Sequence, residues 1–279
     1  LILFTGEKYP KLRNTITVII TGLTFFLVVL MYPTVISKGM TIRYSLPTSI
    51  FGIGLNFSVD PISLLFATIT SLVWFLTSIY LNVYMSHEHK QTRFYFFLTL
   101  ILGCNLGVVL TADFFSLFIF FEGLGLFAYP LIIHSETKDA LAAGTKYLLM
   151  TVIGGLLLLS GILLLYYYSG SYAIAPALES LKDLGYLKFV IAGLIIAGFG
   201  VKAGMMPLHI WLPDAHPVAP TPGSALLSGI MIKAGAYGII RVVGTVFRQA
   251  FEAEAEGGHI SKAVENLWKM SSNLGYWMI

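Results

Sequence analysis

Long apolar stretches alternate with short polar connections along almost the whole chain. The apolar stretches cover residues 14–37, 58–84, 92–112, 113–133, 139–169, 187–213 and 223–247. At about 20 residues or more, each can cross the hydrocarbon core of a bilayer as an α-helix. The pattern predicts an all-α polytopic membrane protein with about seven transmembrane helices. Residues 1–248 are expected to form one integral membrane domain, followed by a polar or amphipathic tail over 249–279.

The sixth apolar stretch, 187–213, is interrupted by Pro207. Proline removes one backbone hydrogen bond and frees the carbonyl four residues earlier, here that of Ala203, next to Lys202. Non-helical backbone at membrane depth persists only where it is buried in protein or lines a watery cavity. We therefore expect a discontinuous transmembrane helix with a charge at its break. The helix after it carries a second lysine, Lys233.

The polar connections contain turn and capping signals. Residues 39–57, rich in Gly, Ser, Thr and β-branched residues, predict a short hairpin or an extended loop outside the hydrocarbon. Asp60 before Pro61 is typical of a helix N-cap, and Asp113 is expected to cap the fourth helix. His87 and His89 are two residues apart, which places them on different faces of a helix. A solvated loop is therefore favoured over a metal-binding pair.

Composition supports the membrane interpretation. Hydrophobic residues make up 57% of the chain and charged residues 11%, with a mean hydropathy of +0.82, whereas soluble domains have about 25% charged residues. The net charge of +3 and the lack of a basic stripe argue against nucleic-acid binding. The single cysteine, Cys104, has no disulfide partner in this chain. No CxxC, nucleotide-binding loop or nucleophile elbow occurs, so we expect no cofactor, metal or catalytic centre.

Four ionisable side chains fall inside the predicted helices. At a rise of about 1.5 Å per residue from one membrane face, Glu122 and Lys202 lie about 18 Å deep and Lys233 about 15 Å deep. Lys146 is shallower, at roughly 10 Å. Because the hydrocarbon core is about 30 Å thick, three charges from separate helices converge on the bilayer midplane. Such groups are costly in lipid and usually mark ion or proton paths.

Less specific interpretations stay open for several of these residues. Glu122 can be a neutral carboxyl group bonded to a neighbouring helix, and Lys146 can extend to the membrane interface. His209 and His216 flank the helix break, where they act either as a proton relay or as simple loop residues.

A buried row of one carboxylate and several lysines suggests a mechanism for proton movement. Desolvation disfavours the charged forms of both residue types, whereas a Glu–Lys contact favours them. Making and breaking such contacts lets protons be taken up and released near neutral pH. No cofactor is needed for this.

The residues around the break resemble a known family. The stretch KAGMMPLHIWLPDAHPVAPTPGSALLSGIMIK, with FSVDPISLLF and the isolated Glu122, is similar to the antiporter-like membrane subunits of respiratory complex I, Mrp-type sodium/proton antiporters and membrane-bound hydrogenases. The resemblance implies that Glu122 is the fifth-helix glutamate, Lys202 the lysine of the broken seventh helix and Lys233 that of the eighth. It also implies that Lys146 is the sixth-helix basic residue that often faces the glutamate.

The resemblance is to part of such a subunit. Full members have two inverted repeats in about fourteen helices, and this chain matches the second to the eighth. It therefore resembles one half of the fold, and we expect another chain to supply the missing second repeat. The resemblance implies other membrane subunits as partners, in a redox-driven complex or an Mrp-type antiporter.

These features and the resemblance favour a proton- or sodium-translocating subunit in the plasma membrane or an equivalent energy-coupling membrane. Lysines disfavour a dehydrated sodium ion beside them, but do not exclude it. A slight excess of Lys and Arg on one face barely orients the chain. Two alternatives remain: a truncated structural subunit without transport of its own, and a stand-alone secondary transporter. The latter is disfavoured because binding sites in such transporters usually lie between two repeats.

Overall fold

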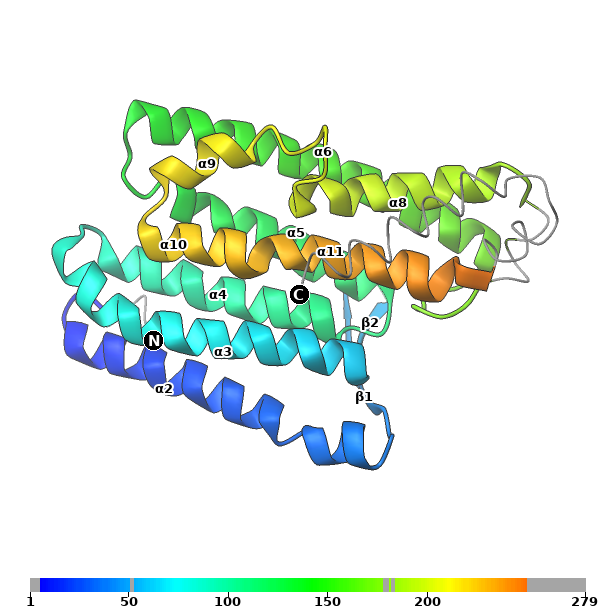
Figure 1. Ribbon diagram of the computed structural model, residues 1–279, viewed down its shortest axis with the longest axis horizontal. Coiled ribbons are helices and arrows are strands. Elements are labelled where there is room, and N and C mark those ends of the chain that lie inside the picture. The colour runs from blue at the N-terminus through cyan, green and yellow to red at the C-terminus, as the bar shows by residue number, and fades with distance from the viewer. Residues whose placement is uncertain (1–5, 51–52, 178–180, 182–183, 250–279) are drawn as a thin grey trace.

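The computed structural model describes residues 6–50, 53–177, 181 and 184–249, so the expected tail over 249–279 lies almost entirely outside the described residues. Its long helices run side by side as a bundle (Figure 1). They are α2 (Pro10–Val29), α3 (Pro61–Tyr84), α4 (Gln91–Leu110), α5 (Phe114–Ile132), α6 (Lys138–Ser169) and α8 (Leu187–Ala203). After α8 come α9 (Leu212–Val218), α10 (Thr221–Leu226) and α11 (Ile232–Arg241). π-helical turns occur at Pro33–Ser37, Leu227–Met231 and Val242–Val246, and a short 3₁₀ turn at Met85–His87.

Six of the described helical segments are long and apolar enough to cross a membrane. They are Pro10–Ser37, Pro61–His87, Gln91–Leu110, Phe114–Ile132, Lys138–Ser169 and Thr221–Val246. The seventh predicted stretch, 187–213, forms α8 and α9 with a non-helical turn between them. The predicted all-α polytopic fold, with one discontinuous helix, is therefore confirmed.

Apolar side chains occupy both the interior and the outer surface of the bundle. Trp74 is fully buried, and its indole N–H donates to the Leu98 carbonyl at 3.1 Å. On the outside of α2, in contrast, Ile19 is 60% exposed and Phe26 56% exposed. A surface of this kind is suited to lipid or to another membrane helix.

A two-stranded antiparallel hairpin closes one end of the bundle, at the right in Figure 1. Strands β1 (Ile42–Ile50) and β2 (Ile53–Val59) pair in register from Ile42 opposite Val59. β2 also bridges to Thr111 in the short turn between α4 and α5. The hairpin expected within 39–57 is thus confirmed, and it packs against the ends of the helices.

Both predicted aspartate caps are confirmed. Asp60 accepts a hydrogen bond from the Ser63 amide at 2.8 Å, and Asp113 accepts one from the Ser116 amide at 2.7 Å. Asp60 has a second role, because its two carboxylate oxygens accept from the two Nη atoms of Arg241, each at 2.7 Å. This bidentate pair joins the start of α3 to the end of α11.

The electrostatics of Asp60 follow from these contacts. Burial alone would raise the pKa of its carboxyl group, but the hydrogen bonds from Arg241 and Ser63 outweigh burial and hold the pKa below its ordinary value. Asp60 is therefore a carboxylate at neutral pH.

Candidate functional site

The helix break is formed by a glycine cap rather than by proline alone. α8 ends at Ala203, and Gly204 adopts a left-handed conformation with φ +69°. The Met205 amide then donates to the Gly200 carbonyl at 2.9 Å, which closes the last helical turn. Pro207 lies three residues inside the turn, so the break begins earlier than the sequence interpretation placed it.

A carbonyl in the last turn of α8 accepts a hydrogen bond from beyond the break, in addition to one from the Gly204 amide. The indole Nε1 of Trp211 donates to the Val201 carbonyl at 2.7 Å, and Trp211 is almost completely buried. The turn between α8 and α9 is thus anchored back onto the end of α8, next to the backbone of Lys202. α8 ends partway along the bundle before the chain turns outward (Figure 1).

Lys202 lies in the last turn of α8 and is only 4% exposed. Its ammonium has one long hydrogen bond, to the Tyr147 hydroxyl at 3.4 Å. That hydroxyl in turn donates to the Gly125 carbonyl at 3.1 Å. The Nζ atom also lies 5.2 Å from the centre of the Phe121 ring, within the range of a cation–π interaction. These contacts only partly replace the hydration that the ammonium has lost.

Glu122 lies near the middle of α5, about 15 Å along the helix axis from Ile132. Its carboxyl group packs against Gly155 of α6, where an added Cβ would meet the Oε1 and Oε2 atoms. Oε1 is buried, and no hydrogen-bond partner for it occurs among the described residues. The glycine therefore makes room for a carboxyl group that is left without a bonded partner.

The half-buried Glu122 and the buried Lys202 interact electrostatically across the space between α5 and α8. Within the described part of the chain, no ion pair of 4 Å or less joins Glu122 and Lys202. Gly125, one turn from Glu122, lets Lys202 approach α5, since a Cβ there would lie 2.6 Å from Nζ. The geometry brings the glutamate and the first lysine to one interhelical space without closing a salt bridge.

Lys146 does not face the glutamate, which corrects the expectation taken from the sequence. Its ammonium binds the Asp214 carboxylate of α9 at 2.7 Å, and the two side chains are 41% and 48% exposed. Glu122 instead contacts Gly155, about 13 Å further along α6. The alternative in which Lys146 extends to the interface describes its position better.

Lys233 is half-buried in α11, just after the π-helical turn Leu227–Met231. Its ammonium donates to the Ser228 carbonyl at 3.0 Å. Two residues later, Gly235 packs closely on Phe199 and Ala203 of α8. Residues two apart lie on nearly opposite sides of a helix, so Lys233 points away from this contact. Lys202 and Lys233 were expected at similar depths in the membrane. For the two ammonium groups to approach each other, the Lys233 side chain would have to change its position.

The two histidines beside the break differ in their surroundings. His216 Nδ1 lies 2.8 Å from the Ser224 hydroxyl, which links α9 to α10. His209 lies in the turn, and its buried Nδ1 has no hydrogen-bond partner in the described ranges. Among the described residues, His209 therefore has a buried ring nitrogen without a partner near the break, whereas His216 is bonded through Nδ1.

Sequence reasoning missed Tyr147 and Asp214 as parts of the site. Tyr147 is one of many aromatic residues in apolar helices, so nothing in the pattern distinguishes it. Asp214 offered a clearer signal, since it is the acidic residue in the quoted motif immediately after the break.

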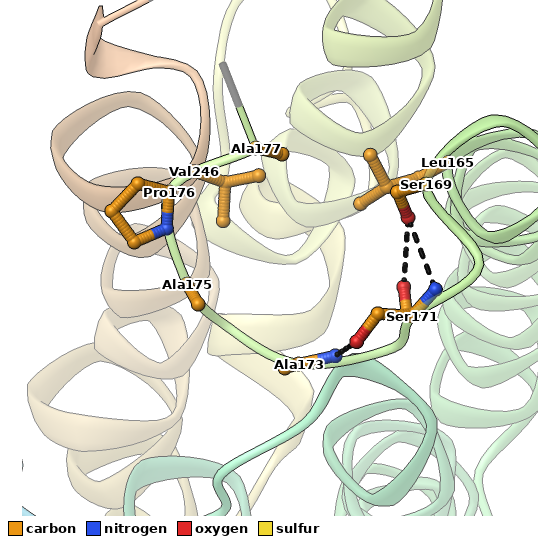
Figure 2. A pocket seen from close by; sticks show the side chains of 8 residues that line it. All are labelled: Leu165, Ser169, Ser171, Ala173, Ala175, Pro176, Ala177 and Val246. Atoms are coloured by element: carbon orange, nitrogen blue, oxygen red, sulfur yellow. Dashed lines mark hydrogen bonds between the residues drawn. The ribbon is translucent and has the colours of Figure 1, made fainter. Parts of the chain in front are cut away.

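The pocket drawn in Figure 2 lies away from this site. It is a cavity of about 130 Å³ lined by Leu165, Ser169, Ser171, Ala173, Ala175, Pro176, Ala177 and Val246. Serine hydroxyls there are bonded to nearby backbone atoms, as with Ser171 Oγ and the Ala173 amide at 3.1 Å. None of the lining residues is titratable near neutral pH, so the pocket is not a candidate for ion transfer.

Two family models match the chain. The model described as NADH:quinone oxidoreductase/Mrp antiporter, transmembrane, matches residues 111–255, and that of the NADH-ubiquinone oxidoreductase (complex I) chain 5 N-terminus matches residues 46–95. The first of these includes every candidate site residue, and the second covers most of the hairpin and all of α3. The matched residues thus span most of the described bundle.

Individual relatives agree with the family models. One Na(+)/H(+) antiporter subunit of Alkalihalophilus pseudofirmus is 33% identical over 87% of this chain and 31% of its own length. Hydrogenase-4 component B of Escherichia coli is 32% identical over 70% of this chain and 29% of its own. A chain of the membrane-bound sulfane sulfur reductase, an archaeal respiratory membrane complex, superposes with a TM-score of 0.79 at 28% identity, covering 87% of this chain and 50% of that one.

This chain therefore spans less than a third of these two curated relatives and half of the solved chain. The two family matches include most of the hairpin, α3, α5, α6, α8 and the break. With residues 111–255 matched, which is more than half of its length, the chain belongs to the NADH:quinone oxidoreductase/Mrp antiporter transmembrane family.

Proposed function

We propose that this chain is an ion-translocating subunit that moves protons, or sodium ions, through Glu122, Lys202 and Lys233 near the middle of the membrane. The observation that carries the proposal is the state of Lys202, which is 4% exposed and, among the described residues, has a single long hydrogen bond at 3.4 Å. A buried ammonium with so few partners is costly unless its charge can change or be compensated.

The carboxyl group of Glu122 supplies that compensation. It is close enough to interact with Lys202 and lacks a hydrogen bond to Oε1 within the described bundle. If the two groups move together, the attraction favours the charged forms of both, and if they separate, desolvation disfavours both. The charged pair and the neutral pair hold the same single proton, so separation transfers that proton from Lys202 to Glu122. Translocation follows when Glu122 releases it on one side and Lys202 takes up another proton from the other side. The Tyr147 hydroxyl, bonded to Lys202 and to the Gly125 carbonyl, holds the lysine between these positions.

Lys233 is the next acceptor in this scheme, because α11 packs directly on α8 beside the break. Its ammonium is held by one backbone carbonyl and is free to turn without breaking an ion pair. Lys146 is assigned a different task, as the tether between α6 and α9. His209, with its free Nδ1 in the turn, is proposed as a relay to the outside of the bundle.

The remaining steps of the path are proposed to lie outside these residues, in companion membrane subunits or in a second repeat. Support comes from the sulfane sulfur reductase chain, which belongs to a respiratory membrane complex and is matched over 50% of its length. We further propose the plasma membrane, or an equivalent energy-coupling membrane, as the location.

Glu122→Gln tests the proposal, since it removes the titratable proton at nearly constant shape. In the native complex reconstituted into proteoliposomes, we expect proton or sodium flux to fall at least tenfold at unchanged assembly. The matched control is Asp139→Asn, which makes the same change at an exposed carboxylate in the first turn of α6. Normal flux in the assembled Glu122→Gln complex would remove Glu122 from the mechanism.

A further inference from the structure

Two loops meet at the end of the bundle opposite the β-hairpin. One follows α3 and the other follows α5, and ion pairs hold them together. Lys90 and Arg93 both bind the Glu136 carboxylate, each at 2.5 Å. The Nη2 atom of Arg93 also donates to the His134 carbonyl at 3.1 Å, which fixes the backbone at that residue.

His134 is the unusual member of this junction. Its side chain is 0% exposed, and neither ring nitrogen has a partner with hydrogen-bond geometry in the described chain, although the His89 backbone lies close by. The ring stacks on that of His89 at 4.9 Å and meets the edge of Phe94 at 5.2 Å. Because buried polar groups are almost always bonded, an orphaned imidazole indicates a missing partner such as an ion or water.

Two further donors surround this imidazole. One ligand atom from each of Glu88, His89 and His134 lies within 4.8 Å of the other two. We propose that these three residues form a binding site for a divalent first-row cation, with Zn²⁺ as the natural occupant. Two imidazoles and one carboxylate are a common zinc donor set, and the fourth position of the tetrahedron would be taken by water.

The geometry requires a modest adjustment. Ligand atoms about 2.1 Å from a tetrahedral zinc ion are roughly 3.4 Å apart, so the donors, which lie within 4.8 Å of one another, must close by about 1.4 Å at most. His134 is held by its buried ring and its bonded carbonyl. Glu88 and His89 belong to the loop after the Met85–His87 turn, and His89 is exposed, so they are the residues that move. One rigid and two adjustable ligands suit capture of an ion that has no preferred d-electron geometry.

The charges around the site permit a cation. Lys90 and Arg93 alone would repel it, but both already bind Glu136. Counting Glu88 as well, the two cations and two carboxylates at this junction sum to zero. An incoming divalent ion therefore meets a locally neutral site whose donors are two imidazoles and the Glu88 carboxylate, which lies 3.9 Å from His89 Nδ1.

The sequence pattern concealed this arrangement. His87 and His89 attract notice together, yet His87 is outside the cluster, and the second imidazole comes from a residue 45 positions later. This gives the test a matched control. His89→Ala removes a ligand from an exposed position, whereas His87→Ala removes an exposed histidine from the same loop and leaves the three donors in place.

The experiment measures zinc in the intact membrane complex, for wild type and both variants. Each preparation is stripped with a chelator, incubated with Zn²⁺, freed of excess ion and analysed for metal per complex. We expect wild type and His87→Ala to retain one zinc ion more than His89→Ala. Competition with a chromophoric chelator should show at least tenfold weaker zinc binding for His89→Ala. With Co²⁺ in place of Zn²⁺, wild type and His87→Ala should show the absorption bands of tetrahedral cobalt, and His89→Ala should not.

Equal zinc content in all three proteins would overturn the proposal, and so would an equal loss in the two histidine variants. Glu88→Gln provides an independent check at a second ligand that is not deeply buried, and unchanged affinity in that variant would also contradict the site. Because the readout is bound metal, the result does not depend on whether the chain translocates ions.

Discussion

The buried ammonium of Lys202 is stabilised by several weak interactions instead of one strong ion pair. Its ammonium has the Tyr147 hydroxyl, the face of Phe121 and a nearby carboxyl group that does not bond to it. It also lies in the last turn of α8, where the helix dipole presents partial negative charge worth about 0.3–1 kcal/mol to a cation. None of these contacts is a strong ion pair, which is the arrangement that the proposed proton transfer through Lys202 needs.

The first prediction compares two lysines. Lys202→Met should abolish flux, since it removes the centre of the row, whereas Lys146→Met should retain more than half of it because only an exposed tether is lost. Proton or sodium flux in proteoliposomes at equal assembly provides the measurement. If the two variants lost the same amount of flux, or Lys146→Met lost more, the break in α8 would serve helix packing and would not control ion movement.

The positions of Glu122 and Lys202 along their helices were predictable from the sequence. The directions in which side chains point around a helix axis were not. Counting residues gives depth along a helix, and it placed Glu122 and Lys202 correctly inside the bundle. Rotation about the axis is a separate quantity: Lys146 and Gly155 are nine residues apart, which at about 100° per residue places them on opposite sides of α6. Similar depth made a Glu122–Lys146 contact plausible, but Glu122 packs against Gly155 and Lys146 points to the opposite side of α6.

At the scale of elements, close helix packing makes room for the site. Gly155 of α6 stands where the Glu122 carboxyl group would meet a Cβ. A methyl group there must displace the carboxyl group or separate α5 from α6, since both helices are packed.

The second prediction follows from this contact. Gly155→Ala should destabilise the protein by about 1–3 kcal/mol and reduce flux by moving Glu122. Gly103→Ala in α4 is the control, because a Cβ at Gly103 meets nothing within 4 Å. Thermal melting in detergent and flux in proteoliposomes would be recorded for both. A Gly155→Ala protein with wild-type stability and flux would show that the carboxyl group has other space available.

Helices and their caps were predictable because their signals are local. The apolar stretches that form the helices, the Asp-Pro pair that begins α3 and the polar segment that forms β1 and β2 can each be recognised from residues close together in the sequence. The start of the break was not predictable in the same way. Pro207 drew attention, but Gly204 ends α8, and the Trp211 indole that bonds to Val201 comes from beyond the turn.

At the scale of the whole molecule, Asp60 and Arg241 join helices that are far apart in sequence. Arg241 also donates to Ser63 Oγ at 2.7 Å and to the Tyr237 hydroxyl at 2.9 Å, so its guanidinium is fully engaged. Its side chain is 8% exposed. Removal of the carboxylate leaves this cation buried without its counter-ion.

The third prediction concerns acid stability. Since the pKa of Asp60 is lowered in the folded protein, its pair stabilises the fold fully above the ordinary aspartate pKa of about 3.9, and the contribution is lost as pH falls below that value. Asp60→Asn should cost about 2 kcal/mol at pH 7, and the difference from wild type should shrink at pH 3–4. Melting temperatures of both proteins across this range, with Asp139→Asn as control, test it. A difference independent of pH would rule out ionisation as the cause.

The two ends of the bundle are fastened unequally. At the hairpin end the Asp60–Arg241 pair is largely shielded from water, whereas at the other end α9 is tied to α6 by the exposed Lys146–Asp214 pair. Dissolved salt screens exposed charges much more than shielded ones. Raising ionic strength should therefore speed hydrogen exchange of α9 amides, such as Ala215, and leave that of Leu64 in α3 unchanged. The attachment of α9 to α6, next to the helix break, would then weaken as the salt concentration of the surrounding solution rises.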